Sequence, residues 1–308
     1  MHEATGSRKP IAPPSPDRPA GQGTAFAALL IGNLALAFGP WFVRLTDVGP
    51  VAAGFWRIAL ATPLLLALAA MTGGRLLTNT RGLFWILTGA GVLFAGDLAA
   101  WHIGIHQTKL ANATLFGNAA TFVFPLYGFL VARAWPTRMQ GLALTLAAIG
   151  AALLMGRSYQ LAPQNFFGDL LCLLAGLLYA GYFIMMARAR TVLAPLPALG
   201  LSSAAAILPL LIAAILLGER VIPGNWTPLI AVALLSQVLG QGLMIFALGR
   251  LSPLVIGLAL LTQPIVAAAI GWIAYGERLG VADVIGALLV AIALVLVRIA
   301  PERAKVAA

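Results

Sequence analysis

The chain has 308 residues, of which 61% are hydrophobic and only 9% are charged, and its mean hydropathy is +0.97. Because a soluble protein of this size carries roughly a quarter charged residues, the composition excludes an ordinary soluble globular protein and indicates a polytopic membrane protein. The net charge of +10 is explained by basic loops on the cytoplasmic side of a membrane, so the lipid bilayer is the expected partner and nucleic acid is not. One cysteine, Cys172, excludes an intrachain disulfide.

The chain begins and ends with short polar segments, and apolar runs fill the rest. Residues 1–22 are rich in proline and polar residues, so we expect a disordered cytoplasmic tail there, and a second cytoplasmic tail at 301–308. Ten runs of roughly spanning length lie between them: 24–45, 51–71, 82–105, 110–132, 139–156, 168–188, 197–217, 227–248, 253–275 and 281–299. The links are short and contain Gly and Pro. The expected fold is therefore all-α, a polytopic membrane protein with about ten transmembrane helices.

Basic residues predict the orientation of these helices. If the N-terminus lies inside, thirteen of the 19 Lys and Arg residues fall on inside segments and six outside or in an outer half. Cytoplasmic loops carry an excess of Lys and Arg, so this distribution predicts that both termini are cytoplasmic.

The sequence contains a weak internal repeat, in which similar residues recur about 145 positions apart. It pairs Gly23 with Gly168, Gly104 with Gly249, Gly141 with Gly286, and the amide Asn118 with the amide Gln263. Five helices per copy is an odd number, so the second copy must enter the membrane in the opposite direction. We therefore expect two inverted five-helix repeats, 23–157 and 158–300, which is an architecture of secondary transporters. A bundle that merely duplicated, without transport, is the alternative.

Polar side chains recur at helical spacing within several runs. They are Asn33 in the first run, Thr114, Asn118 and Thr121 in the fourth, Tyr179 and Tyr182 in the sixth, Gln237 and Gln241 with Met244 in the eighth, and Gln263 in the ninth. Lipid offers polar groups no partner, so these side chains should face other helices or a water-filled cavity. Hydrogen bonds between helices, worth about 0.6–2 kcal/mol each, are the alternative explanation. Five helices with such faces favour a central wet cavity that binds substrate.

Asp97 is the only carboxylate well inside a run, where a charge costs at least about 2.5–3.5 kcal/mol. It is a candidate for binding a substrate ammonium group or carrying a proton, together with Trp101 and His102 on the same helix. A capped helix break, or a pair with Arg57 or Lys109, would explain it without function. His102 and His106 have a spacing that suits a metal, but no third ligand is evident, so we expect no metal site.

Glycine and proline mark the expected bending points of the helices. These hinge candidates are Gly39 with Pro40, Pro125, and Pro264 beside Gln263. Phosphate-loop, His-Glu-x-x-His and Gly-x-Ser-x-Gly motifs are absent from the sequence, which argues against an ATP-driven pump and the familiar membrane proteases and esterases. We therefore expect neither an enzyme nor a cofactor.

Particular motifs resemble a known family. The segment from Pro264 to Trp272, the turn Gly276-Glu277-Arg278 and the pair Gly286-Ala287 resemble the end of an EamA repeat, and Gly168-Asp169-Leu170-Leu171 resembles the start of one. Phe55-Trp56-Arg57 resembles the second-helix arginine of the first repeat. The resemblance covers the chain after residue 23 and identifies it with the drug/metabolite transporter superfamily. Within that superfamily it is similar to the YddG-type amino-acid exporters.

This resemblance implies ten helices in two inverted repeats, and export from the cytoplasm across a bacterial inner membrane. Two features depart from the family pattern. The first repeat has Val131-Ala132-Arg133 where the Gly-Glu turn would fall, and the first run lacks the membrane glutamate of the small multidrug exporters. The second departure puts a glutamate-based proton coupling in doubt.

Our hypothesis from the sequence is a secondary transporter that exports small amphipathic metabolites, first of all amino acids, by alternating access around a central cavity. Three alternatives remain: transport of sugar phosphates or nucleotide sugars on the same fold, a membrane enzyme acting on lipid, and a scaffold or receptor. The first would need cavity-facing Lys or Arg, and the second would need Asp97 and His102 to converge. The oligomeric state is not predicted, and a monomer is compatible with the sequence.

Overall fold

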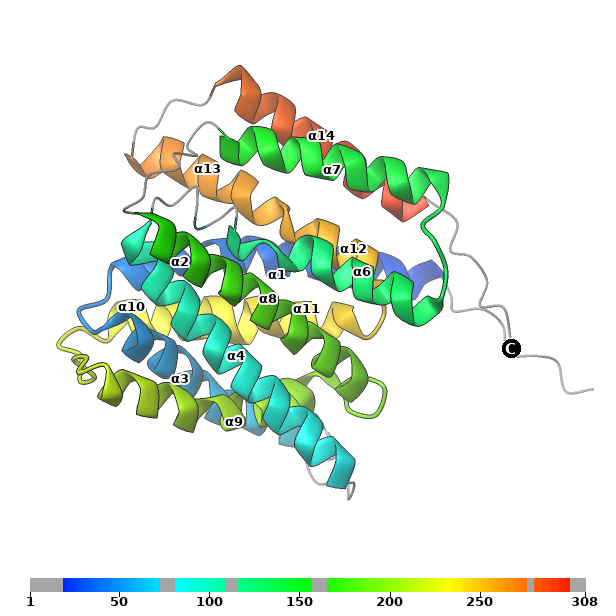
Figure 1. Cartoon of the computed structure of the whole chain (residues 1–308). Helices are drawn as coiled ribbons and strands as arrows, with labels where there is room; N and C mark the ends of the chain where they lie inside the picture. The colour runs from blue at the N-terminus through cyan, green and yellow to red at the C-terminus, as the bar shows by residue number, and fades with distance from the viewer. Residues whose placement is uncertain are drawn as a thin grey trace, which may run out of the picture.

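The structure is a computed structural model, and it describes residues 19–72, 81–108, 113, 116–156, 165–275 and 280–299. Within these ranges every regular element is a helix (Figure 1). In the first half they are α1 (Pro19–Ala37), α2 (Gly39–Arg44), α3 (Pro50–Met71), α4 (Arg81–Gln107), α6 (Ala120–Ala132) and α7 (Arg138–Gly156). In the second half they are α8 (Phe166–Ala189), α9 (Pro195–Leu216), α10 (Thr227–Ala231), the π-helical η2 (Val232–Gln241), α11 (Gly242–Leu248), α12 (Pro253–Leu260), α13 (Thr262–Tyr275) and α14 (Val281–Ile299).

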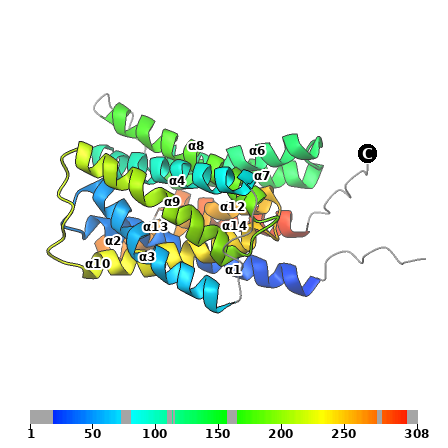
Figure 2. The same cartoon turned by 90° about the horizontal axis from the view of Figure 1, so that it is seen from below.

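The helices have the length and apolar character of a membrane bundle. Six helical segments of the described chain are long and apolar enough to cross a membrane, and four shorter apolar helices accompany them. Together they account for the ten runs expected from the sequence, and the all-α prediction is confirmed. The first helix begins and the last helix ends at the same end of the bundle, which we call the terminal end (Figures 1 and 2).

The internal repeat is visible in the helix boundaries. The span Gly21–Arg44 and the span Phe166–Ala189 each have 24 residues, and the bounds of the second lie 145 positions after those of the first. The same offset relates Pro50–Met71 to Pro195–Leu216, each of 22 residues. Both members of this second pair begin with proline after a residue in extended conformation, at Gly49 and at Ala194. Proline suits the first helical position because its missing N–H would have no partner there.

Helix packing follows the repeat. Helix α3 packs on its repeat equivalent α9, α7 on α14, and α6 on α12. In the described part of the chain, the other helices pack mainly on helices that are not their own repeat equivalents. Helix α1 of the first half packs on η2 and α11 of the second half, and α8 of the second half packs on α4 of the first. Exchanging the two halves therefore reproduces this set of contacts, as the pseudo-two-fold symmetry of inverted repeats requires. Close approach of α7 and α14 depends on Gly150, where a Cβ would lie 2.8 Å from the carbonyl oxygen of Gly286.

In the described part of the chain, three of the expected membrane-spanning segments are interrupted. The first span breaks at Phe38 between α1 and α2, the fourth has a turn at Asn118 and Ala119 before α6, and the ninth breaks at Leu261 between α12 and α13. In the first and the ninth, a proline lies two or three residues after the break, at Pro40 and Pro264. Proline has no N–H, so it cannot donate to the carbonyl four residues earlier, and the helix is interrupted there.

At the end of the bundle opposite the terminal end, two links are tied to each other. Glu219 accepts hydrogen bonds from the backbone N–H groups of Val51 (3.2 Å) and Ala52 (2.8 Å), which lie in the first turn of α3. A carboxylate stabilises a helix at that position because the N–H groups there lack helical partners. Asp47 accepts a 2.7 Å bond from the Gly224 N–H, and this bond holds the pKa of the exposed Asp47 carboxyl below its ordinary value of 3.8.

Candidate functional site

A cavity of about 120 Å³ lies between helices of both repeats. Its lining comprises Leu36, Ala37, Gly39 and Pro40 at the α1–α2 break, Arg57 of α3, Phe94, Asp97, Leu98 and Trp101 of α4, Ala113, Gly117 and Asn118 before α6, Tyr179 of α8, and Leu260 and Gln263 at the α12–α13 break. The cavity is lined by the last residues of α1, which begins at the terminal end, and by Arg57 near the start of α3, which begins at the opposite end. The cavity therefore lies toward that opposite end. All three interrupted spans contribute to its wall.

Arg57 is the cation of this cavity. It is 6% exposed and lies about two turns into α3, inside the span. Its Nε donates a 3.1 Å hydrogen bond to Oε1 of Gln237, and its guanidinium carbon lies 5.8 Å from the ring centre of Phe94. Gln237 in turn donates from Nε2 to Oγ of Ser203 at 3.2 Å. A buried charge needs such partners, and these hold the guanidinium at the cavity wall.

Asp97 supplies a carboxyl group to the same cavity. It is partly exposed, whereas its helix neighbours Phe94 and Leu98 are buried. No salt bridge within 4 Å joins Asp97 to Arg57 in the described part of the chain. The cavity therefore presents a guanidinium and a carboxyl group that are not paired with each other, an arrangement that can contact both ends of an amino acid.

Aromatic side chains form the apolar part of the wall. Trp101 lies against the backbone of the fourth span at Gly117, where an added Cβ would be 3.1 Å from the indole Nε1. Glycine at that position therefore makes room for the indole ring. Phe94 and Tyr179 lie with their ring centres 6.2 Å apart and stacked. These rings can take up the apolar part of an amphipathic molecule.

Amide side chains connect the two repeats around the cavity. Gln263 at the start of α13 donates from Nε2 to Oδ1 of Asn33 at 2.9 Å, and Asn33 donates from Nδ2 to the Leu29 carbonyl at 3.0 Å. The Tyr179 hydroxyl donates to Oε1 of Gln241 at 3.2 Å. Gln237 and Gln241 both lie in the π-helical η2, whose wider turn keeps them on the side that faces α3 and α8. π-helical segments are frequent at functional sites.

The structure divides the predicted site residues into three groups. Asp97, Trp101, Asn118, Tyr179 and Gln263 line the cavity, together with the hinge candidates Gly39 and Pro40. In a layer directly behind it, Asn33, Gln237 and Gln241 bond to lining residues. The remaining candidates, His102, Thr121, Tyr182 and Met244, are fully buried elsewhere in the bundle, and Thr114 lies outside the described residues.

His102 illustrates the third group. Its Nδ1 lies 2.8 Å from the carbonyl oxygen of Pro50, so that nitrogen carries the proton and donates, while Nε2 is buried without a hydrogen-bond partner. It does not converge with Asp97 on the cavity. Among the described residues, no three His, Cys, Asp or Glu side chains gather as a metal site would require.

The hinge candidates differ in their surroundings. Pro40 and Pro264 follow helix breaks, whereas Pro125 lies inside the continuous α6. Pro125 packs instead against Gly257 of α12, where an added Cβ would lie 2.6 Å from the Thr121 carbonyl oxygen. The turn Gly276-Glu277-Arg278, which marks the family in the sequence, lies outside the described residues.

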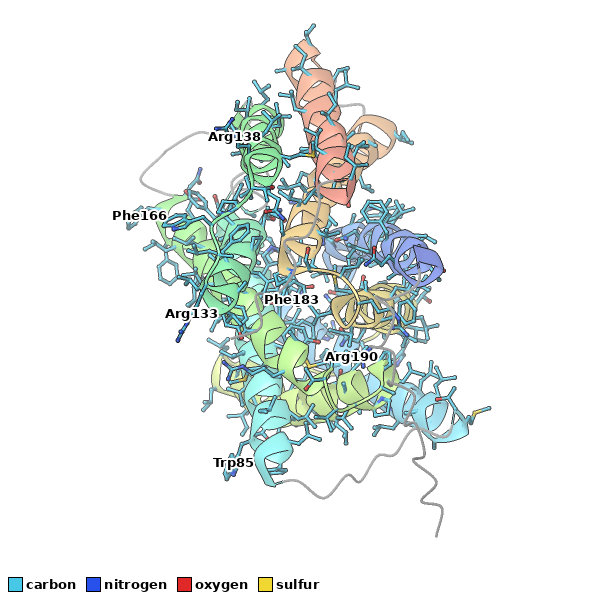
Figure 3. All side chains as sticks on the ribbon, turned by 90° about the vertical axis from the view of Figure 1, so that its right-hand side faces the viewer. Trp85, Arg133, Arg138, Phe166, Phe183 and Arg190 are labelled. Atoms are coloured by element: carbon cyan, nitrogen blue, oxygen red, sulfur yellow. The ribbon has the colours of Figure 1, made fainter. Side chains whose placement is uncertain are left out.

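Between the cavity and the terminal end, aromatic rings fill the bundle. Tyr182 stacks on Phe94 with ring centres 4.6 Å apart, Phe183 lies 4.2 Å from Tyr179, and Phe124 lies 5.4 Å from Phe183. Viewed along the bundle from the terminal end, Phe183 lies near the centre (Figure 3). We call Phe94, Phe124, Tyr179, Tyr182 and Phe183 the aromatic layer; its rings pack against one another on the terminal-end side of the cavity.

Sequence reasoning missed Arg57 and Phe94 as cavity residues. Arg57 follows Trp56 near the start of a span, where an interfacial anchor or a structural pair is the ordinary role of an arginine. A stronger signal was available, since an arginine seven residues inside a helix that begins at Pro50 lies about 10 Å along it. Phe94 lies one turn before Asp97 on the same helix face, which was the only signal for it.

Comparison with known proteins identifies the family. The EamA-like transporter family matches residues 23–156 and again residues 166–299. The chain therefore belongs to the EamA-like transporter family, within the drug/metabolite transporter superfamily, and this part of the sequence interpretation is confirmed. The family points to transport rather than catalysis.

A curated relative and a solved structure agree with this assignment. The relative, an "Uncharacterized transporter" of Archaeoglobus fulgidus, is 26% identical over 149 residues, which are 46% of this chain and 50% of the relative. The chain thus matches about half the length of this relative. A solved structure, titled "Crystal structure of protein", superposes with a TM-score of 0.74 over 92% of this chain and 99% of its own, at 18% identity. That likeness supports the fold.

Proposed function

We propose that this protein is a secondary transporter that exports small amphipathic metabolites, amino acids first among them, by alternating access. The observation that carries the proposal is that the guanidinium of Arg57 and the carboxyl group of Asp97 line one cavity with an aromatic wall. An amino acid presents the same three features: a carboxylate, an ammonium group and a side chain. Arg57 binds the carboxylate, Asp97 binds the ammonium group, and Trp101 receives the side chain.

The interrupted helices add backbone acceptors to this site. Leu36 and Leu260 line the cavity, and each lies four residues before a proline, so neither carbonyl can accept the helical bond that Pro40 or Pro264 would otherwise donate. Carbonyl oxygens freed in this way suit an ammonium group, and discontinuous helices at the repeat interface are a feature of secondary transporters. The start of α13, with Gln263 in its first turn, offers the positive end of a helix dipole to a carboxylate.

Alternating access requires that the cavity close at one end and open at the other. In this proposal the aromatic layer closes the cavity toward the terminal end, and we assign that end to the cytoplasm. Cytoplasmic links are richer in Lys and Arg than outer links. Among the described arginines, the links of the terminal end have Arg133, Arg138, Arg188, Arg190 and Arg250, whereas those of the opposite end have Arg44 and Arg220. The exporting direction and the inner-membrane location follow from the resemblance to YddG-type exporters. Substrate from the cytoplasm enters when the aromatic layer opens, and the repeats then rock.

Transport of sugar phosphates or nucleotide sugars is the second candidate, and Arg57 is the observation that favours it, because it is a cavity-facing arginine. Asp97 in the same cavity repels a phosphate dianion, so amino acids fit the balance of charge better. A lipid-acting enzyme has less support, because Asp97 and His102 do not meet at the cavity.

Counterflow into proteoliposomes tests the proposal. Vesicles preloaded with a mixture of amino acids should accumulate labelled phenylalanine or leucine faster than protein-free vesicles. In Asp97→Asn, the preference for phenylalanine over N-acetylphenylalanine should decrease, since the acetylated molecule has no ammonium group for Asp97 to bind. Asp47→Asn, in an exposed link, is the matched control and should keep the preference. Flux of every tested amino acid at the protein-free rate would refute amino-acid transport, and flux of a sugar phosphate instead would favour the second candidate.

A further inference from the structure

Helices α6 and α7 are separated by a groove on the outside of the bundle. Its volume is about 870 Å³, larger than the central cavity. Helix α7 packs on α14, while α6 packs on α12 and α8, so the two helices that face each other across the groove are held by different neighbours. In Figure 1, α7 and α14 lie together above α6. The groove is therefore built into the packing of the bundle.

The chemistry of the groove is apolar along its length and cationic at one end. Phe122, Leu126 and Leu130 of α6 are exposed on one wall. The opposite wall carries Thr145, whose hydroxyl donates a hydrogen bond to the Gly141 carbonyl oxygen at 3.0 Å. Because the hydroxyl is bonded within its own helix, that wall is effectively apolar. At the end of α6 the lining includes Arg133 and Trp135, the latter 87% exposed. An exposed tryptophan beside an arginine is typical of the boundary between acyl chains and headgroups.

We propose that this groove binds one anionic phospholipid, with an acyl chain between α6 and α7 and the phosphate at Arg133. The dimensions fit, because Phe122 to Leu130 rise about 12 Å along a helix and one leaflet of the hydrocarbon core is about 15 Å deep. The charge also fits, since Arg133 lines the groove and has no ion pair within the described part of the chain, while Arg138 begins α7 outside the lining. Both arginines lie on the same side of the bundle as seen end-on (Figure 3).

The backbone supports the same assignment. Arg133 caps the end of α6 in the left-handed conformation, with φ 47°, and it is the one non-glycine residue with positive φ among those described. This conformation ends the helix at the mouth of the groove, so the arginine side chain leaves α6 where the acyl-chain wall stops. The site is independent of the central cavity, and its failure or success leaves the transport proposal untouched.

Native mass spectrometry of the full chain tests the site. The protein is reconstituted in nanodiscs containing equal amounts of phosphatidylglycerol and phosphatidylcholine with identical acyl chains, and is then released with mild detergent. The wild type should retain one phosphatidylglycerol in preference to phosphatidylcholine. Arg133→Gln should reduce that preference about fivefold, because one arginine near an anionic surface has roughly that effect. Ala148→Trp, which fills the groove from its exposed α7 wall, should remove the retained lipid.

Matched controls distinguish a built site from general attraction of anionic lipid. Arg188→Gln removes an exposed charge at the same end of the bundle, and Ala204→Trp adds an indole to an exposed position of α9; both should behave as the wild type. Leu126→Trp provides a second blocking variant if Ala148→Trp does not fold. Equal retention of the two lipids by the wild type would overturn the proposal. So would an equal loss in Arg133→Gln and Arg188→Gln, or a change of oligomeric state in the blocking variants with lipid retention unchanged.

Discussion

At the scale of single residues, Arg57 distinguishes this cavity from a merely polar gap between helices. Among the described residues its partner is the neutral Gln237, and no carboxylate lies within 4 Å, so its charge stays available to a bound anion. Hydrogen bonds to charged groups contribute about 1.5–3 kcal/mol, which is enough for the guanidinium to determine substrate affinity.

Replacing this guanidinium should separate carboxylate recognition from general binding. We expect Arg57→Gln to lower amino-acid counterflow by about tenfold to a hundredfold, because the lost bond corresponds to that range. The variant should also lose the preference for an amino acid over its methyl ester, while Arg57→Lys should keep part of it. Counterflow in proteoliposomes measures both, with Arg220→Gln on an exposed link as the control. An Arg57→Gln protein that still prefers the free acid at the wild-type rate would contradict the assignment.

Asp47 gives a prediction about pH. Its carboxyl accepts the Gly224 N–H and has a lowered pKa, so the bond stabilises the link above the ordinary pKa of 3.8 and is lost as the pH falls through the lower folded value. Hydrogen exchange at the Gly224 amide, corrected for intrinsic rates, should therefore show constant protection down to about pH 4 and decreasing protection below it. In Asp47→Asn this acid-dependent loss should be absent.

The Thr227 amide is an internal control for that experiment. It is bonded to the side-chain oxygen of Asn225 at 3.1 Å, and an amide oxygen does not titrate in this range. Protection at Thr227 should stay level, and a parallel loss at both amides would mean that the whole link opens in acid for another reason.

At the scale of helices, the interruptions were only partly predictable. The prolines and Asn118 can be located in the sequence, and the missing N–H groups of Pro40 and Pro264 favour the breaks at Phe38 and Leu261. Proline alone does not predict a break, because Pro209 lies inside the continuous α9. Pro125, also a hinge candidate, lies in an uninterrupted helix, and Gly257 of α12 packs closely on it. That contact joins residues 132 positions apart, and no local pattern in the sequence predicts it.

The burial of polar residues shows the same limit. Helical spacing correctly predicts that Gln237 and Gln241 share a face, yet the partners that occupy them, Arg57 and Tyr179, come from other helices. Tyr182 and Tyr179 lie on one face of α8, but one ring is buried in the aromatic layer and the other reaches the cavity. Local sequence determines which face of a helix a side chain occupies. Whether that side chain reaches the cavity or is buried behind its wall is determined by packing against other helices.

The break at Leu261 should be removable. Pro264→Ala restores an N–H that can donate to the Leu260 carbonyl, so α12 and α13 should become more continuous. We expect a Tm increase of a few degrees together with transport slowed severalfold, because a straightened helix gains stability and loses a bending point. Thermal unfolding and counterflow measure the two effects.

Pro209→Ala is the matched control, since that proline lies inside α9 without a break. It should leave the transport rate near that of the wild type. If both proline variants slow transport equally, the break at Leu261 has no special role in the movement of the repeats.

At the scale of the whole molecule, the described arginines favour a cytoplasmic terminal end. Single-cysteine labelling tests this orientation in a Cys172→Ala background, which removes the buried native thiol. A membrane-impermeant maleimide should label Asn225→Cys in intact cells and Thr191→Cys only after permeabilisation, because these exposed links lie at opposite ends. Labelling in the reverse pattern would place the cavity mouth in the cytoplasm and reverse the proposed exporting cycle.

The exchange of partners between the repeats also constrains how the protein is made. During synthesis α1 to α7 leave the ribosome first, and at that stage Arg57 has no Gln237 and Asn33 has no Gln263. A charged side chain at membrane depth costs about 2.5–3.5 kcal/mol without such partners. We therefore expect the newly made first half to be less stable in the membrane than the complete chain, in which α8 to α14 supply both partners.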